Sequence, residues 1–362
     1  HALYEWPSVL GPVAWGGEML QNLLLAYASA AAVECYRSWR QGRPAWRQAW
    51  IRFSIPVVVW ASLCVVDPPA PVVGPAAAVD VVAFEPGREE SKRLMYSRDS
   101  YAMANATLAI AGRGAADPPD LVVWPETAVD PLWFARGSPL QLAASTRFAG
   151  GSLLRDGEFD YSALVLFDPL GRVLGWNEKR HPVPAAERMP WLFAMPEWIR
   201  TWCEGIVGYV PRMGFGRPRP SLETAAGVPF GGMMCFDNAF DDVAREHVAA
   251  GARFLVVASN EIWYDQGAEL DQMVAMSVFR ALETATPLVR STSDGRTVAV
   301  RASGEIVAPP LERVAGRAGI GFLRTDLQPG PGALGPLAWL HPLLDWLLPL
   351  SGVLLVGLIR RK

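Results

Sequence analysis

The chain has 362 residues, of which 51% are hydrophobic and only 19% are charged, and its mean hydropathy is +0.16. Soluble domains carry about 25% charged residues, so the missing polar surface indicates either an unusually large core or segments that face lipid. The 33 basic and 36 acidic residues leave a net charge of −3, which excludes a nucleic-acid binder that depends on bulk positive charge. Four cysteines without a CxxC pair exclude a disulfide scaffold and give no indication of a zinc site.

Three apolar segments are candidates for membrane spans, at residues 9–33, 53–66 and 334–359. A helix that crosses the hydrocarbon core needs about 20 apolar residues. The first and third segments therefore qualify on length, and the second is marginal. A buried core helix is the alternative interpretation of each segment.

Basic residues lie at the ends of these segments. Five arginines fall between residues 37 and 52, and the chain closes with Arg-Arg-Lys at 360–362. Short basic loops mark the cytoplasmic side of a membrane, so three spans would place residues 68–330 outside and both basic clusters inside. Glu18 and Asp345 lie within the expected spans. We expect them to mark contacts between these spans or with further spans upstream, or else to lie near an interface.

The pattern changes between the second and third spans, where β-rich runs alternate with helical stretches. This alternation predicts one layered α/β domain. The expected strands are 79–84, 120–124, 148–154, 161–167, 172–178, 228–236, 254–260 and 297–301, and the expected helices are 99–112, 241–250 and 268–284. We therefore expect two spans with a basic cytoplasmic loop at 1–67, a linker at 68–78, an extracytoplasmic catalytic domain at 79–330 and a C-terminal span at 331–362.

Three expected strand ends carry reactive side chains. Glu126 follows an apolar run and a proline turn, Lys179 follows a second strand, and Cys235 ends a third. Each alone has a plainer interpretation: a solvated turn residue, a surface lysine and an inert core cysteine. Together they form a complete set for acyl transfer, because a thiol with a pKa of about 8.5 needs a base, a carboxylate can accept its proton and an ammonium can stabilise an oxyanion.

The motifs around these residues resemble those of the nitrilase (carbon-nitrogen hydrolase) superfamily, and most closely its integral-membrane apolipoprotein N-acyltransferase family. The matching motifs are WPETA at 124–128, KRHPVP at 179–184, the strand that ends at Cys235, SNEIWY at 259–264, QM at 272–273, RALE at 280–283, PLVR at 287–290, DG at 294–295 and GEI at 304–306.

This resemblance implies a nitrilase-like αββα sandwich, flanked by transmembrane helices, on the periplasmic side of a bacterial inner (plasma) membrane. It implies that the chain is the C-terminal part of a longer protein with further spans. Glu126 would be the general base, Lys179 the oxyanion stabiliser, Cys235 the nucleophile and Glu187 a supporting carboxylate. A phospholipid would donate the acyl chain to Cys235 as a thioester, and the N-terminal amine of a diacylglyceryl-cysteine apolipoprotein would accept it. We expect a monomer that needs no cofactor and no metal.

The chain departs from the resembled family at two places. The family has Tyr-Glu after the nucleophile, whereas this chain has Phe236 and Asp237, which we also expect to support the site. The shorter aspartate would move a carboxylate by roughly an ångström, enough to affect catalysis. The family's Asn-Asp-Ala-Trp-Phe-Gly is here Asn-Glu-Ile-Trp-Tyr-Asp at 260–265, which leaves the identity of the acceptor open.

An aromatic segment at 189–215 follows the lysine motif. Tryptophan favours the headgroup level of a bilayer, so this segment is expected to form a lid that dips into the interface. The expected lipid-facing residues are Trp191, Phe193, Trp198 and Trp202. Ordinary packing of a loop against the domain is the alternative.

Three functions remain open from the sequence. The first is the phospholipid-dependent N-acyltransferase, and the second is a membrane-anchored amidase of the nitrilase type that hydrolyses a C–N bond. The third is a catalytically inactive scaffold that binds lipoproteins.

Overall fold

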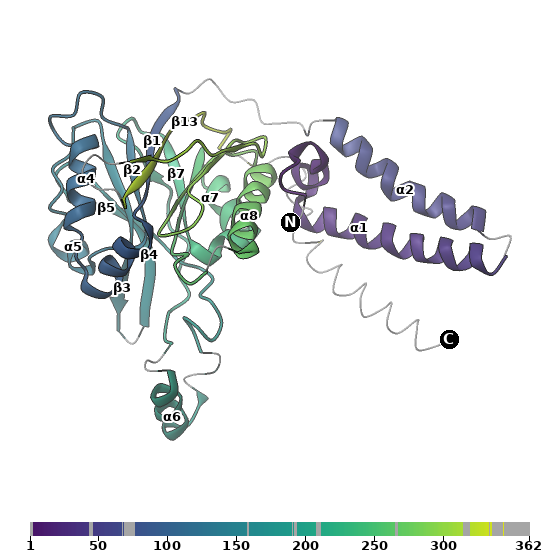
Figure 1. Cartoon of the computed structure of the whole chain (residues 1–362), viewed down its shortest axis with the longest axis horizontal. Coiled ribbons are helices and arrows are strands. Elements are labelled where there is room, and N and C mark those ends of the chain that lie inside the picture. The colour runs from purple at the N-terminus through teal and green to yellow at the C-terminus, as the bar shows by residue number, and fades with distance from the viewer. Residues whose placement is uncertain are drawn as a thin grey trace.

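The chain begins with two long helices and continues into a layered α/β domain (Figure 1). The computed structural model describes residues 3–42, 46–66, 68, 77–157, 159–189, 191, 194–207, 211–264, 267–313, 319–332, 334 and 343. The elements and contacts given below belong to these residues.

The two N-terminal helices are α1 (Gly11–Arg40) and α2 (Trp46–Val65), which lie side by side. Among the described residues, α2 is the one helix long and apolar enough to cross a membrane. The prediction that the second apolar segment is only marginally long enough for a span was therefore wrong. The helix begins at Trp46 instead of residue 53 and so reaches 20 residues. The third expected span lies outside the described residues, apart from Leu334 and Leu343, and so does Asp345.

The start of α1 is embedded in the domain. Leu10 and Val13 are fully buried in an apolar cluster with residues of α7 (Asp241–Ala249) and α8 (Ala268–Thr284). Glu18 also faces α8: its backbone N–H donates to Glu283 Oε1 at 2.9 Å, and its carboxylate lies 3.4 Å from Arg280 Nη2. The described partners of Glu18 thus belong to the globular domain and not to another expected span.

Two sheets form the centre of the domain. The first has seven described strands in the order β12-β13-β1-β2-β3-β4-β5, and the second has six in the order β11-β10-β9-β8-β7-β6. The bounds in the first sheet are Glu312–Arg313, Gly321–Leu327, Val79–Glu85, Leu121–Val129, Arg147–Asp156, Phe159–Phe167 and Val173–Glu178. Those in the second are Ile306–Val307, Ala299–Val300, Leu288–Thr292, Phe254–Ser259, Pro229–Met234 and Leu222–Glu223.

Each sheet has a parallel centre, β1-β2-β3 in one and β7-β8-β9 in the other. Parallel strands are covered on both faces and are therefore rich in apolar residues. An apolar layer that includes Val123, Leu164 and Val256 lies between the sheets. Helices α4 (Tyr101–Ala111) and α5 (Pro131–Arg136) lie outside the first sheet, and α7 and α8 lie outside the second (Figure 1). The α/β class is confirmed, and the layers are stacked as helix, sheet, sheet, helix.

The remaining helical segments are short. They are the 3₁₀-helices at Pro7–Val9 and Cys235–Ala239, α3 (Gly87–Lys92), a π-helix at Arg93–Ser97 and α6 (Glu197–Val207).

Two expected strand boundaries differ from the structure in ways that matter for the site. We expected a turn at Pro125, but β2 continues to Val129, with a shift of register between Trp124 and Val129. Proline has no N–H to donate to the ladder, so the strand is irregular at this point. The strand expected at 228–236 also ends earlier than predicted. Strand β7 ends at Met234, and Cys235 begins the following 3₁₀-helix.

Candidate active site

Glu126, Lys179 and Cys235 come from three separate strands. Glu126 lies in the irregular part of β2, Lys179 directly follows β5, and Cys235 directly follows β7. The close approach of β3 to Glu126 requires Gly151, because a Cβ there would lie 2.5 Å from the Cα of Glu126. The sandwich thus brings together side chains that are more than fifty positions apart in the sequence.

Glu126 is only 5% exposed, and its carboxylate accepts three hydrogen bonds. Ser162 Oγ donates at 2.9 Å and Lys179 Nζ at 3.3 Å to Oε1, and the backbone N–H of Asn260 donates to Oε2 at 3.2 Å. Burying a carboxylate is costly unless such donors replace water. The three donors hold the Glu126 carboxylate in one place inside the domain.

Lys179 is fully buried between two carboxylates. Its Nζ lies 3.3 Å from Glu126 Oε1 and 2.7 Å from Glu187 Oε1, and the backbone N–H of Val183 donates to Glu187 Oε2 at 2.7 Å. Burial by itself lowers the pKa of Lys179, but the charges of Glu126 and of Glu187 outweigh it and raise the pKa. Burial raises the pKa of Glu187, although Lys179 opposes this. The lysine therefore remains an ammonium.

Cys235 has a left-handed backbone conformation, with φ +46°. A residue with a side chain in such a conformation costs of order 1–3 kcal/mol, and strain of this kind clusters at functional sites. The residue is partly exposed. Burial of the thiol, followed by the charge of Glu126, raises its pKa to about 12, although Lys179 and the Ser259 hydroxyl oppose this. The resting thiol therefore keeps its proton and needs a base before it can attack a carbonyl.

Asp237 connects the lysine segment to the cysteine turn. Its fully buried carboxylate accepts hydrogen bonds from the backbone N–H groups of Arg180 at 3.0 Å, His181 at 2.8 Å and Met234 at 3.2 Å. It therefore holds together the two chain segments that carry Lys179 and Cys235. Burial raises the pKa of Asp237 to about 6, although the N–H groups of His181 and Met234 and the charge of Lys179 oppose the shift.

Phe236, the second residue of the Cys235 turn, packs edge-on against Phe240, with ring centroids 5.1 Å apart. It supports the turn by an aromatic contact rather than by a hydrogen bond. Phe236 and Asp237 thus act on the backbone around the site.

The pKa of Asp237 predicts a pH dependence of stability. An unfolded aspartate has a pKa of about 3.9, so between about pH 4 and pH 6 the unfolded chain releases a proton that the folded protein retains. Rising pH therefore lowers the free energy of unfolding over this window, by about 3 kcal/mol from this group. We expect the free energy of unfolding of Asp237→Asn to fall less than that of the unaltered protein over this pH window. Urea denaturation of both proteins at several pH values measures the difference, and parallel curves for the two would contradict the prediction.

The expected lid residues do not line the site. Trp191, Trp198 and Trp202 are 79%, 72% and 65% exposed, and α6, which carries the last two, projects away from the sheets (Figure 1). Phe193 lies outside the described residues. The three described indoles are therefore not packed against the domain.

Two partners of Glu126 were missed by the sequence analysis. Ser162 lies on β4, and only its buried polar side chain in an apolar strand distinguishes it. The N–H of Asn260 is a backbone donor, for which the sequence carries no signal. The sequence analysis also did not predict the fully buried ion pair between Glu261 and Arg290. The signal available was the position of Arg290 directly after the apolar residues 287–289, since a buried arginine in a strand is unusual without a partner.

Comparison with known proteins places the chain in a family. The family model described as carbon-nitrogen hydrolase matches residues 95–316, more than half of the chain. An apolipoprotein N-acyltransferase of Geobacter metallireducens is 32% identical over 203 residues, covering 53% of this chain and 38% of that protein. One of Gloeobacter violaceus is 30% identical over 278 residues, covering 72% of this chain and 48% of that protein.

The chain thus spans less than half the length of these two relatives. Among solved structures, a carbon-nitrogen hydrolase from Helicobacter pylori G27 is similar, with a TM-score of 0.46 at 15% identity, covering 68% of this chain and 89% of that one. The match of the family model is decisive, and the chain belongs to the carbon-nitrogen hydrolase (nitrilase) family, with curated relatives that are named apolipoprotein N-acyltransferases.

Proposed function

We propose that this chain carries the catalytic domain of a membrane N-acyltransferase. It moves a fatty acyl chain from a phospholipid, through a thioester on Cys235, to the N-terminal amine of a diacylglyceryl-cysteine apolipoprotein. One observation supports this most strongly: the buried Lys179 ammonium lies between Glu126 and Glu187, within electrostatic reach of the Cys235 thiol. The names of the curated relatives support the same reaction.

In the first half-reaction, Glu126 removes the proton of the Cys235 thiol as the sulfur attacks an ester carbonyl of the phospholipid. The C=O electron pair moves onto oxygen, and the Lys179 ammonium stabilises this oxyanion. When the pair returns, the C–O bond to the lysophospholipid breaks, and Glu126 gives its proton to the leaving oxygen. The acyl group remains on Cys235 as a thioester.

In the second half-reaction, the α-amine of the apolipoprotein attacks the thioester carbonyl. Glu126 accepts the proton lost by the nitrogen, and Lys179 again stabilises the oxyanion. Collapse forms the amide and breaks the C–S bond, and the sulfur recovers the proton from Glu126. The carboxylate, the ammonium and the thiol return to their starting states, so the cycle needs no cofactor.

The membrane arrangement is part of the proposal. Residues 1–67 would contribute two spans with the basic loop in the cytoplasm, and residues 331–362 a third span. The linker at 68–78 would lead to a catalytic domain at 79–330 on the periplasmic side of the plasma membrane. The apolar helix α2 supports a span, and the five arginines at residues 37–52, which lie on the end of α1, in the connection and on the start of α2, support this orientation.

The direct test of the proposal is mass spectrometry of Cys235 after incubation with phospholipid. We expect a fatty acyl thioester on this residue, removed by hydroxylamine, and none on the Cys235→Ala variant. An unmodified thiol in the unaltered protein would refute the acyltransferase assignment.

The family match favours a second candidate, a membrane-anchored amidase that hydrolyses a C–N bond. The same preparation separates the two functions. Release of ammonia from small amides, without any requirement for lipid and without an acyl thioester from phospholipid, would support the amidase.

We further propose that the exposed tryptophans of α6 contact the bilayer as part of a lid. The double variant Trp198→Ser, Trp202→Ser is expected to raise the KM for phospholipid about tenfold or more, because burial of one large apolar side chain contributes about 1.5–3 kcal/mol. The rate at saturating lipid should change little. Tyr101→Ser, at an equally exposed aromatic residue on α4, is the control. Equal values of KM for the two variants would argue against the lid.

A further inference from the structure

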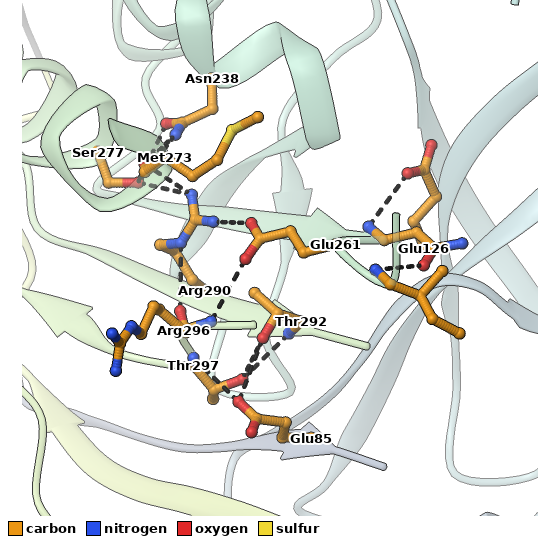
Figure 2. Close-up of polar contacts among 12 residues, drawn as sticks. Glu85, Glu126, Asn238, Glu261, Met273, Ser277, Arg290, Thr292, Arg296 and Thr297 are labelled. Atoms are coloured by element: carbon orange, nitrogen blue, oxygen red, sulfur yellow. Dashed lines mark hydrogen bonds and ion pairs between the residues drawn. The ribbon is translucent and has the colours of Figure 1, made fainter. Parts of the chain in front are cut away.

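Glu261 and Arg290 form an ion pair whose two side chains are fully buried. Glu261 follows Asn260 at the end of β8, and Arg290 lies in the middle of β9. Figure 2 shows the guanidinium facing the Glu261 carboxylate on one side and α8 on the other. Buried ion pairs contribute little net stability, because desolvation offsets their attraction, so this pair calls for another explanation.

Glu261 is connected to the proposed base, Glu126, through the neighbouring residue Asn260. Glu261 is the next residue after Asn260, whose backbone N–H donates to Glu126 Oε2 at 3.2 Å. The Asn260 side chain also donates to Thr127 Oγ1, at 3.3 Å. Anchoring of Glu261 therefore fixes the backbone that holds the carboxylate of Glu126.

The Arg290 end leads to the proposed nucleophile. Its Nη1 donates to Met273 O at 3.1 Å and to Ser277 Oγ at 3.0 Å, both on α8. Asn238 Nδ2 donates to the same two acceptors, at 2.9 Å and 3.0 Å (Figure 2). Asn238 belongs to the 3₁₀-helix that begins with Cys235. The guanidinium and the cysteine turn are therefore held by the same two atoms of α8.

We propose that Glu261 and Arg290 are a positioning pair that sets the Glu126 carboxylate relative to the Cys235 thiol. The space around the pair agrees with this role. Glu261 Oε2 also accepts the backbone N–H of Arg296 at 3.3 Å, and a Cβ at Gly295 would lie 2.0 Å from that oxygen. The longer glutamate, where the resembled family has aspartate, therefore fits only against glycine.

The experiment measures how fast iodoacetamide alkylates Cys235, as a function of pH, in the full chain. This readout uses the reactivity of the thiol and needs no acyl substrate, although the inference rests on the proposed roles of Glu126 and Cys235. Glu261→Gln keeps the size of the side chain and removes its charge. We expect alkylation to slow about tenfold at neutral pH, since small displacements of reacting groups have large effects on rate. We also expect the midpoint of the curve of rate against pH to shift to higher pH.

Glu283→Gln is the matched control. Glu283 pairs with Arg280 on the same helix α8, and both side chains are buried. This variant should lower the melting temperature to a similar extent but leave the alkylation rate unchanged. Equal effects of the two variants on alkylation, or no effect of Glu261→Gln, would overturn the inference.

A second variant keeps the test decisive if Glu261→Gln does not fold. Glu261→Asp retains the charge but shortens the side chain, and it should slow alkylation about threefold; an unchanged rate would overturn the inference. Failure of the proposed function gives a different result. In that case the unaltered protein forms no acyl thioester, while alkylation still depends on Glu261.

Discussion

Substitution of Glu126 by glutamine is expected to slow the acylation of Cys235 by about 100- to 10,000-fold, the usual contribution of a general base. The amide keeps the shape of the side chain but cannot take the proton of the thiol. Burial raises the pKa of that thiol to about 12, so almost no thiolate forms without a base. Single-turnover formation of the thioester from phospholipid, followed by mass spectrometry, measures the rate.

The control for this substitution is Glu178→Gln, the same chemical change at the residue next to Lys179. Glu178 pairs with Arg219 and accepts a hydrogen bond from Trp176 Nε1 at 3.0 Å, outside the buried cluster. Its rate should stay within about threefold of the unaltered protein, although its stability falls modestly. A similar loss in both variants would mean that the effect of Glu126→Gln is structural, and it would remove Glu126 from the role of base.

Replacement of Lys179 by methionine is expected to destabilise the fold by about 3–5 kcal/mol at neutral pH, because it leaves buried carboxylates without their counter-ion. In the folded protein the pKa of Lys179 is raised, so its contribution to stability is fully present below the unfolded lysine pKa of about 10.4 and is lost only at higher pH. The loss of folding stability in the variant should become smaller toward acid pH. There Glu187, whose pKa is already raised by burial, can take up a proton.

Urea denaturation of Lys179→Met at about pH 5 and pH 8 tests this sign. Lys92→Met is the control, since Lys92 is half-exposed and pairs with the exposed Glu89; such surface pairs contribute little to stability. If Lys179→Met loses little free energy of unfolding, or loses more as the pH falls, the result would contradict the role of Lys179 as counter-ion of the buried carboxylates. Thioester formation should also fall in Lys179→Met, because the developing oxyanion loses its ammonium.

Much of the layered domain can be predicted from the sequence, since apolar runs with turn residues between them have few other interpretations. The helix at 268–284 has the expected bounds, and the α/β order holds. Strand β9 was not among the expected strands. It contains Arg290, Ser291 and Thr292, all fully buried, and polar side chains interrupt the apolar pattern on which a strand prediction depends.

The candidate site was predictable only in part. Glu126, Lys179 and Cys235 could be chosen together because their chemistry is complementary. The contacts that hold them could not, because Ser162 Oγ and the N–H of Asn260 reach Glu126 from β4 and from the end of β8. Such long-range contacts depend on how the two sheets are stacked. The left-handed backbone of Cys235 likewise lies in a turn that tertiary hydrogen bonds hold, since Asp237 accepts from the backbone N–H groups of Arg180 and His181.

The burial of Leu10 and Val13 against α7 and α8 has a practical consequence for anyone who wishes to produce the layered domain without the two N-terminal helices. A cut between α2 and β1 retains all the described strands but uncovers apolar side chains on the outer helices, including those of Val243, Val248 and Phe279. Exposed patches of this kind promote aggregation. Removal of the two N-terminal helices would therefore also take away part of the apolar cluster of the layered domain, and a shortened chain needs polar replacements on that face.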